Sequence, residues 1–241
     1  ARQTGKSTLV QWIAEQGSHR ARYVTLDDAT ILSAVSQDPV GFLSGLEGPV
    51  VIDEVQQAPG LFPAIKMEVD RNPTPGRFLL TGSADVLLLP NLAESLAGRM
   101  EVLTLWPFSM GEKAGRQEHF IDRAFAAERL PAHRRSCTRP QLFEQICAGG
   151  FPETQGRVEN RRKDAWFGSY ITTILQRDVR DLADIDHLTL MPRLLALLAS
   201  RTMALLNYSE LARTLGLAQS TLKRYFALLE TTFLVQFLPP W

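Results

Sequence analysis

The first eight residues constrain the fold of this chain more than any other segment. They read ARQTGKST and run directly into an apolar helical pattern that begins at Leu9. The motif G-x-x-x-x-G-K-S/T, which wraps backbone N–H groups around a phosphate at the start of a helix, is matched except for its first glycine. This pattern predicts a phosphate-binding loop, although a Gly-Lys-Ser turn that only caps a helix would explain the segment if it stood alone.

The chemistry of phosphate binding explains each residue type in this loop. Gly5 lets the backbone approach the phosphates, Lys6 reaches the β- and γ-phosphates, and the Ser7 hydroxyl is a ligand for Mg²⁺. The residues expected to contact the nucleotide are Arg2, Gln3, Thr4, Gly5, Lys6, Ser7 and Thr8.

A second motif is a pair of carboxylates, Asp53 and Glu54, after the apolar run at 49–52. Asp53 is suited to hold Mg²⁺ through its water shell, and Glu54 is suited to polarise the water that attacks the γ-phosphate. A solvated strand end explains the pair by itself. Together with residues 1–8 it indicates hydrolysis of a nucleoside triphosphate.

Three further residues are candidates for phosphate contacts. Thr81 and Ser83 follow a third apolar run, and a hydroxyl there would sense the γ-phosphate or the attacking water; a plain strand-to-helix turn is the alternative. Arg99 would add positive charge near a phosphate, or would form a surface ion pair instead.

The apolar runs at 22–26, 49–53, 77–81 and 100–105 alternate with helical patterns such as 61–69. This order predicts an α/β fold, a mostly parallel sheet covered by helices on both faces. After residue 140 the pattern is helical throughout.

The overall composition excludes several classes of protein. The chain has 26 Lys plus Arg and 26 Asp plus Glu, so it is not a globally basic nucleic-acid binder. Cys137 and Cys147 have no metal-site spacing and are expected to be reduced thiols. Without a signal peptide or a long apolar run, we expect a cytoplasmic protein with no membrane partner.

The segment from Ser209 to Glu230 has the pattern of a helix-turn-helix, with Gly216 at the turn. Leu222, Tyr225, Phe226 and Leu229 are spaced to form a buried stripe. The other face of the second helix would contact DNA through Gln219, Ser220 and Lys223, or would serve a structural or protein-contact role; both remain open.

The order of these motifs resembles a prokaryotic AAA-type (P-loop) ATPase family with a C-terminal domain of unknown function. The segments that resemble it, over nearly the whole chain, are 2–7, 26–28, 38–43, 52–56, 80–83, 96–99, 149–153 and 177–179. The resemblance implies ATP and Mg²⁺ binding by Lys6, Ser7, Asp53 and Glu54. It also implies a sensor role for Thr81 or Ser83 and a phosphate-facing role for Arg99. Arg177 would pair with Asp181 on the helix surface, or would reach a nucleotide in its own or a neighbouring subunit.

Charge distribution and the proline- and cation-rich stretch at 130–140 suggest three regions: an AAA-type ATPase domain at 1–130, a linker and helical lid at 131–188, and a winged-helix or helix-turn-helix region at 189–241. The last region has 5 Lys plus Arg and 2 Asp plus Glu, a net charge of +3. Two departures from the family are visible. The strand and glycine before the phosphate loop are absent, and the chain stops at Trp241 where family members continue, so we expect a fragment that binds ATP weakly when isolated.

Two functions follow from this pattern. The first is an ATPase that couples hydrolysis to a conformational change in the helical half. The second is a nucleotide-gated DNA-binding regulator that uses the helix-turn-helix. Self-assembly or a protein partner is compatible with either function.

Overall fold

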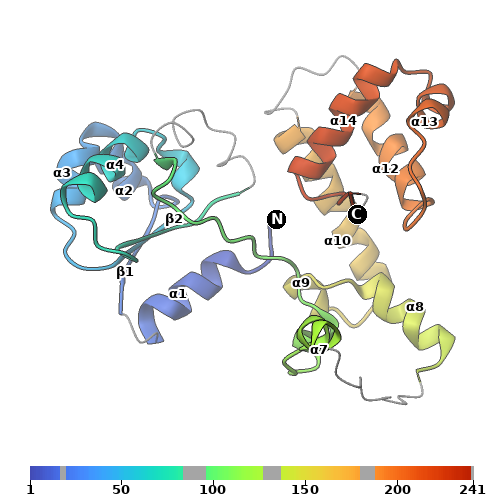
Figure 1. Cartoon of the computed structure of the whole chain (residues 1–241), viewed down its shortest axis with the longest axis horizontal. Coiled ribbons are helices and arrows are strands. Elements are labelled where there is room, and N and C mark those ends of the chain that lie inside the picture. The colour runs from blue at the N-terminus through green and yellow to red at the C-terminus, as the bar shows by residue number, and fades with distance from the viewer. Residues whose placement is uncertain (17–19, 84–95, 127–136, 180–187, 240–241) are drawn as a thin grey trace. The chain divides into compact units, whose positions relative to one another are not determined.

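The computed structural model of the chain describes residues 1–16, 20–83, 96–126, 137–179 and 188–239 (Figure 1). Residues 104–168, together with Ala1 and residues 3–5, form one compact unit. Arg2, residues 6–103 and residues 169–241 form the other. The domain boundary expected near residue 130 lies outside the described residues.

A three-stranded parallel sheet is the centre of the N-terminal α/β part. Its strands are β1 (Arg22–Thr25), β2 (Val50–Asp53) and β3 (Phe78–Leu80), in the order β1-β2-β3. All four residues of β2 are buried, which suits a central strand of β-branched side chains covered on both faces. Three of the four predicted strands and their parallel arrangement are therefore confirmed.

Helices cover both faces of this sheet, as the sequence pattern predicts. On one face, α1 (Lys6–Gln16) packs Val10 and Ala14 against Val51 of β2 (Figure 1). The other face is covered by α2 (Ala29–Gln37), α3 (Pro39–Ser44) and α4 (Leu61–Arg71). Asp28 and Asp38 start α2 and α3 by accepting backbone N–H groups of the first turn.

The strand predicted at 100–105 is wrong. These residues have no regular secondary structure, and the side chain of Leu103 is 81% exposed. A strand needs a neighbouring backbone to satisfy its N–H and C=O groups, and in the described part of the chain the sheet ends at β1 and β3. The apolar composition of the segment is typical of a strand, but composition cannot supply the pairing partner.

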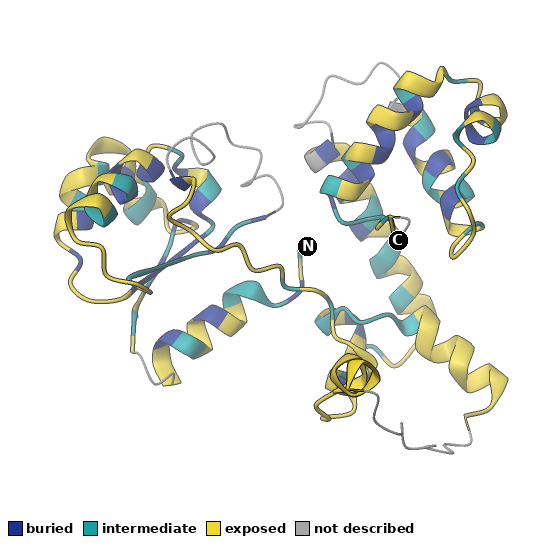
Figure 2. Ribbon diagram, viewed as in Figure 1, coloured by how far each residue is buried: buried dark blue, intermediate teal, exposed yellow. Residues whose placement is uncertain are grey.

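The unit at 104–168 is helical. Its helices are α6 (Met110–Lys113), α7 (Phe120–Phe125), α8 (Arg139–Ala148), α9 (Pro152–Gln155) and the first part of α10 (Asn160–Thr173). The Trp166 ring lies 5.2 Å from that of Phe151 and 5.0 Å from that of Phe167. Helices α7 and α8 are exposed along most of their length (Figure 2).

Residues 169–241 form a separate helical core. After α10 come a π-helical turn, η3 (Ile174–Asp178), then η4 (Leu188–Leu190), α12 (Met191–Ala199), α13 (Tyr208–Leu215) and α14 (Gln219–Thr231). The predicted stripe on α14 is buried: Leu222, Tyr225, Phe226 and Leu229 are at most 2% exposed. Gly216 ends α13 with φ of 67° and α14 begins at Gln219, so the two helices and the turn expected between residues 209 and 230 are present. The described residues of this part contain no strand, so the wing is not confirmed.

Two sequence-based exclusions can be compared with the structure. Among the described residues, no helix has the length and apolar character needed to cross a bilayer. Cys137 and Cys147 are both free and exposed.

Candidate functional site

The segment at 1–8 has the loop-then-helix form that a phosphate-binding loop requires. Gln3 and Gly5 have positive φ angles of 56° and 89°, and α1 begins at Lys6. Glycine is the residue that adopts such a backbone without steric cost, which explains Gly5. The nucleotide contacts of residues 2–8 stay a prediction, but their backbone is compatible with them.

Lys6 is the cation of the site. Burial lowers the pKa of its ammonium group below the ordinary value; the charges of Glu54 and Asp53 oppose this shift, and Arg2 adds to it. The electrostatic contribution of both carboxylates places the start of α1 near the carboxyl end of β2. Lys6 thus carries the positive charge that a nucleotide phosphate needs, and the two carboxylates whose charges act on its pKa are of the kind that binds a divalent cation.

Asp53 is the most confined carboxylate of the site, with 3% of its surface exposed. Tyr23 of β1 donates its hydroxyl hydrogen to Asp53 Oδ2 at 2.7 Å, and Thr81, just after β3, donates to Oδ1. Three neighbouring strands thus meet at this side chain. The network is possible because the strands are parallel, so their carboxyl ends lie at one edge of the sheet.

Glu54 has an unusual backbone. Its φ and ψ are 58° and 41°, in the left-handed region that residues with a Cβ rarely occupy, and the short helix η1 (Val55–Gln57) follows directly. The side-chain amide of Gln56 donates to Glu54 Oε2. Strained residues of this kind cluster at functional sites, because the surrounding structure must hold them in place.

Of the other predicted phosphate-contacting residues, two lie buried after β3 and two lie elsewhere. Thr81 and Ser83 are buried at the end of β3, where Thr81 contacts Asp53. Arg99 pairs with Asp70 through two bonds, of 2.6 and 3.2 Å, which is the ion-pair alternative for this residue. Its phosphate-facing role stays a prediction, as does that of Arg177, which is exposed on η3.

The two side chains predicted to bind Mg²⁺ carry the oxygen ligands that this ion prefers. Ser7 supplies a hydroxyl and Asp53 a buried carboxylate, both of them oxygen ligands. Mg²⁺ keeps several of its waters and is bound through one or two carboxylates together with substrate phosphates, so a small set of protein oxygens is sufficient. Ser7 lies in the first turn of α1, directly after Lys6.

Sequence reasoning missed Tyr23 and Gln56. Tyr23 lies within a predicted strand, and its contact with Asp53 depends on the register that pairs Thr25 with Asp53. Two-residue alternation places Tyr23 and Thr25 on one face of β1, but only the register aligns that face with Asp53. For Gln56, its position two residues after the proposed catalytic acid Glu54 was the only indication that its amide bonds to that carboxylate.

Two of the three candidate DNA-contacting side chains on α14 make contacts with α13. Gln219 donates to Ser209 Oγ at 2.8 Å, and the Lys223 ammonium lies 5.7 Å from the centre of the Tyr208 ring. Both contacts join α14 to the start of α13. They give these two exposed side chains a structural role at the surface between α13 and α14.

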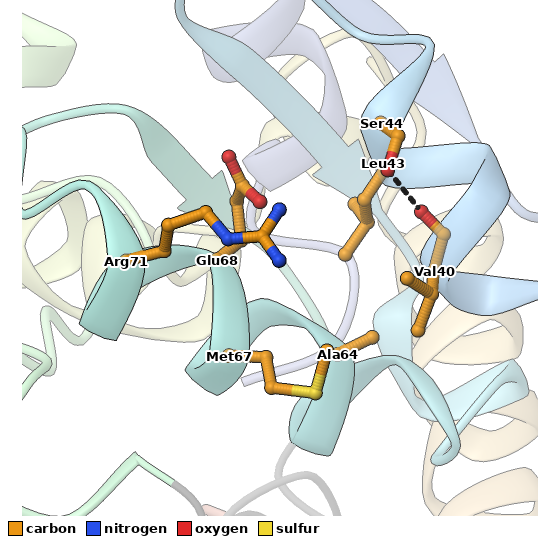
Figure 3. Close-up of a pocket in the computed structure, with 7 residues that line it drawn as sticks. All are labelled: Val40, Leu43, Ser44, Ala64, Met67, Glu68 and Arg71. Carbon is orange, nitrogen blue, oxygen red and sulfur yellow. Dashed lines mark hydrogen bonds between the residues drawn. The ribbon is translucent and has the colours of Figure 1, made fainter.

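A small pocket of about 50 Å³ lies between α3 and α4 (Figure 3). It is lined by Val40, Leu43, Ser44, Ala64, Met67, Glu68 and Arg71. Ser44 donates to the Val40 carbonyl at 2.8 Å at its rim. None of the predicted nucleotide-site residues lines this pocket.

Comparison with known proteins divides the chain in two. Residues 1–114 match a family described as AAA domain. Residues 139–241 match a family described as domain of unknown function (DUF8612), which begins where α8 begins. No solved structure matches the chain.

Two curated relatives, from Mycobacterium bovis and Mycobacterium tuberculosis, are both described as uncharacterized proteins. Each is 35% identical to this chain over 245 residues, an alignment that covers 100% of the chain and 48% of the relative. The chain therefore spans about half the length of the curated relatives it matches.

Proposed function

We propose that the chain binds ATP with Mg²⁺ and hydrolyses it, because residues 1–114 match the AAA domain family and residues 139–241 match a domain of unknown function. The observation that supports this most directly is the meeting of Lys6, Asp53, Glu54 and Thr81 at the carboxyl edge of the sheet. An ammonium group, a buried carboxylate, a second acid and a hydroxyl are the groups that phosphoryl transfer to water requires.

Each residue has one role in this proposal. The loop at 2–8 and Lys6 hold the phosphates, and Ser7 and Asp53 hold Mg²⁺, which neutralises charge on the β- and γ-phosphates when bound. Glu54 polarises the attacking water. Its left-handed backbone, together with the bond from Gln56, fixes where the carboxylate is presented.

We further propose that Thr81 transmits the state of the nucleotide to the rest of the chain. Its hydroxyl donates to Asp53, while its backbone carbonyl accepts from Val55 N at 3.0 Å, next to Glu54. A displacement of Asp53 on loss of the γ-phosphate would therefore move the end of β3 and the start of η1 together. Ser83 and Arg99 are proposed as further contacts, and a conformational change in the helical half would follow.

The test uses the full-length protein and measures phosphate release and ATP binding separately. Glu54→Gln should bind Mg²⁺·ATP like the wild type but lose at least about 100-fold in turnover, because a positioned base contributes 10²–10⁴-fold. Lys6→Ala should lose binding. Glu47→Gln, the same chemical change at an exposed loop position, is the matched control. Unchanged turnover in Glu54→Gln would remove Glu54 from the mechanism.

A nucleotide-gated DNA-binding regulator has less support. Of the three candidates for DNA contacts, Gln219, Ser220 and Lys223, the first donates to Ser209 and the last lies over the Tyr208 ring. No observation on α14 favours a DNA contact over this structural role, so hydrolysis of ATP is the only function proposed.

A further inference from the structure

The carboxylate of Asp53 is held from two sides. Each of its oxygens accepts one hydroxyl hydrogen, Oδ2 from Tyr23 on the strand to one side of β2 and Oδ1 from Thr81 beyond the strand on the other side. The terminal torsion of an aspartate is soft, so a single hydrogen bond leaves the carboxylate free to rotate. Two donors on opposite sides fix its plane.

We infer that Tyr23 is a positioning residue for the metal site: its hydroxyl holds the Asp53 carboxylate in the orientation that receives Mg²⁺. This inference rests on the proposed function, because Asp53 is a metal ligand only there. A carboxylate has about four acceptor positions, and two hydroxyl bonds leave acceptor capacity on both oxygens for metal-bound water. Tyr23 therefore orients Asp53 without competing for all of its lone pairs.

The packing of the Tyr23 ring does not depend on its hydroxyl, so the role of the hydroxyl can be tested by itself. Its ring packs beside Val10 and Ala14 of α1 and Val51 of β2, so the apolar part of the side chain is already anchored. Replacement by phenylalanine would keep those contacts and remove only the hydroxyl. Loss of an outer-shell partner of a metal ligand costs 10–100-fold in metal affinity. Because Thr81 still holds the other oxygen in the variant, we expect the lower end of that range.

The experiment uses the full-length protein with a bound fluorescent ADP analogue, titrated with Mg²⁺. In Tyr23→Phe, the Mg²⁺ concentration at half-maximal response should rise about tenfold. Affinity for the same analogue in EDTA should match the wild type, because Lys6 and the loop are unchanged. Tyr225→Phe is the matched control, since the Tyr225 hydroxyl is buried without a hydrogen-bond partner among the described residues. An unchanged Mg²⁺ midpoint in a folded Tyr23→Phe protein would overturn the inference.

A second measurement distinguishes action through Asp53 from a general weakening of the site. In an Asp53→Asn background, adding Tyr23→Phe should change the Mg²⁺ midpoint less than twofold, because the carboxylate that Tyr23 orients is already gone. A further tenfold rise in the double variant would show that Tyr23 acts by another route and would reject the proposal. A wild-type protein that binds the analogue but shows no Mg²⁺ response would contradict the proposed function itself. That outcome differs from an unchanged midpoint in Tyr23→Phe, which contradicts only the role of Tyr23.

Discussion

Glu54 occupies a backbone conformation that should destabilise the fold, and this can be measured. Its φ of 58° and ψ of 41° cost a residue with a Cβ about 1–2 kcal/mol. Glycine avoids that cost but adds about 0.4–1 kcal/mol of unfolded-chain entropy. Glu54→Gly should therefore be more stable than Glu54→Ala by about 0.5–1 kcal/mol. Both variants lack the carboxylate, so the loss of its bond with Gln56 cancels in the comparison.

Urea unfolding followed by circular dichroism gives the free energies of unfolding of the two variants. Ala34→Gly, at an exposed interior position of α2, is the matched control and should lose about 1 kcal/mol. If glycine in place of alanine lowers the free energy of unfolding at position 34 but raises it at position 54, the strain lies at residue 54. If Glu54→Gly is no more stable than Glu54→Ala while Ala34→Gly behaves as expected, the left-handed backbone stores no energy and the reasoning is refuted.

Three other changes have defined outcomes. Burial lowers the pKa of Lys6 from 10.5, so Lys6 loses its proton at a lower pH than an ordinary lysine. Nucleotide affinity should fall as the pH rises through that lowered pKa. Lys6→Arg should remove this pH dependence, because arginine stays charged. Burial and the bond to Asp53 raise the pKa of Tyr23 from 10.0 to about 12, so an absorbance titration of the wild type should show one phenol near pH 12 that is missing in Tyr23→Phe. That shift stabilises the fold below pH 10, and the stabilisation should disappear as the pH rises through about 12. Leu222→Ala, at a fully buried position of α14, should cost 2–5 kcal/mol in urea unfolding, whereas the exposed Leu238→Ala should cost less than about 0.5 kcal/mol.

The parts of the fold that were predicted correctly have local signals. Residues 49–53 are a run of apolar residues ending in an acid, and α14 repeats its buried side chains at helical spacing. Such signals need no knowledge of the rest of the chain. The segment at 100–105 has the same local signal as β2, but pairing is a long-range property, and the sequence does not say which backbone will lie beside it.

The candidate site shows the same division. Lys6, Asp53 and Glu54 were identified because their motifs are short and chemically specific. The contact of Tyr23 with Asp53 crosses 30 positions of the chain and depends on strand register, which alternation alone does not determine. The left-handed backbone of Glu54 had no sequence signal either, because glycine or asparagine is the residue that usually announces it.

The parallel sheet also has a consequence for how the chain folds. Thr25 pairs with Asp53 and Ile52 with Leu80, so each pairing joins residues 28 positions apart and must close a long loop before any bond is gained. Helices α13 and α14, in contrast, meet across a three-residue turn at 216–218. Local helical contacts form faster than long-range strand pairings. We therefore expect the N-terminal sheet, although synthesised first, to complete its folding after the C-terminal helices, and its unpaired β2 to be the segment most exposed to misassociation on the ribosome.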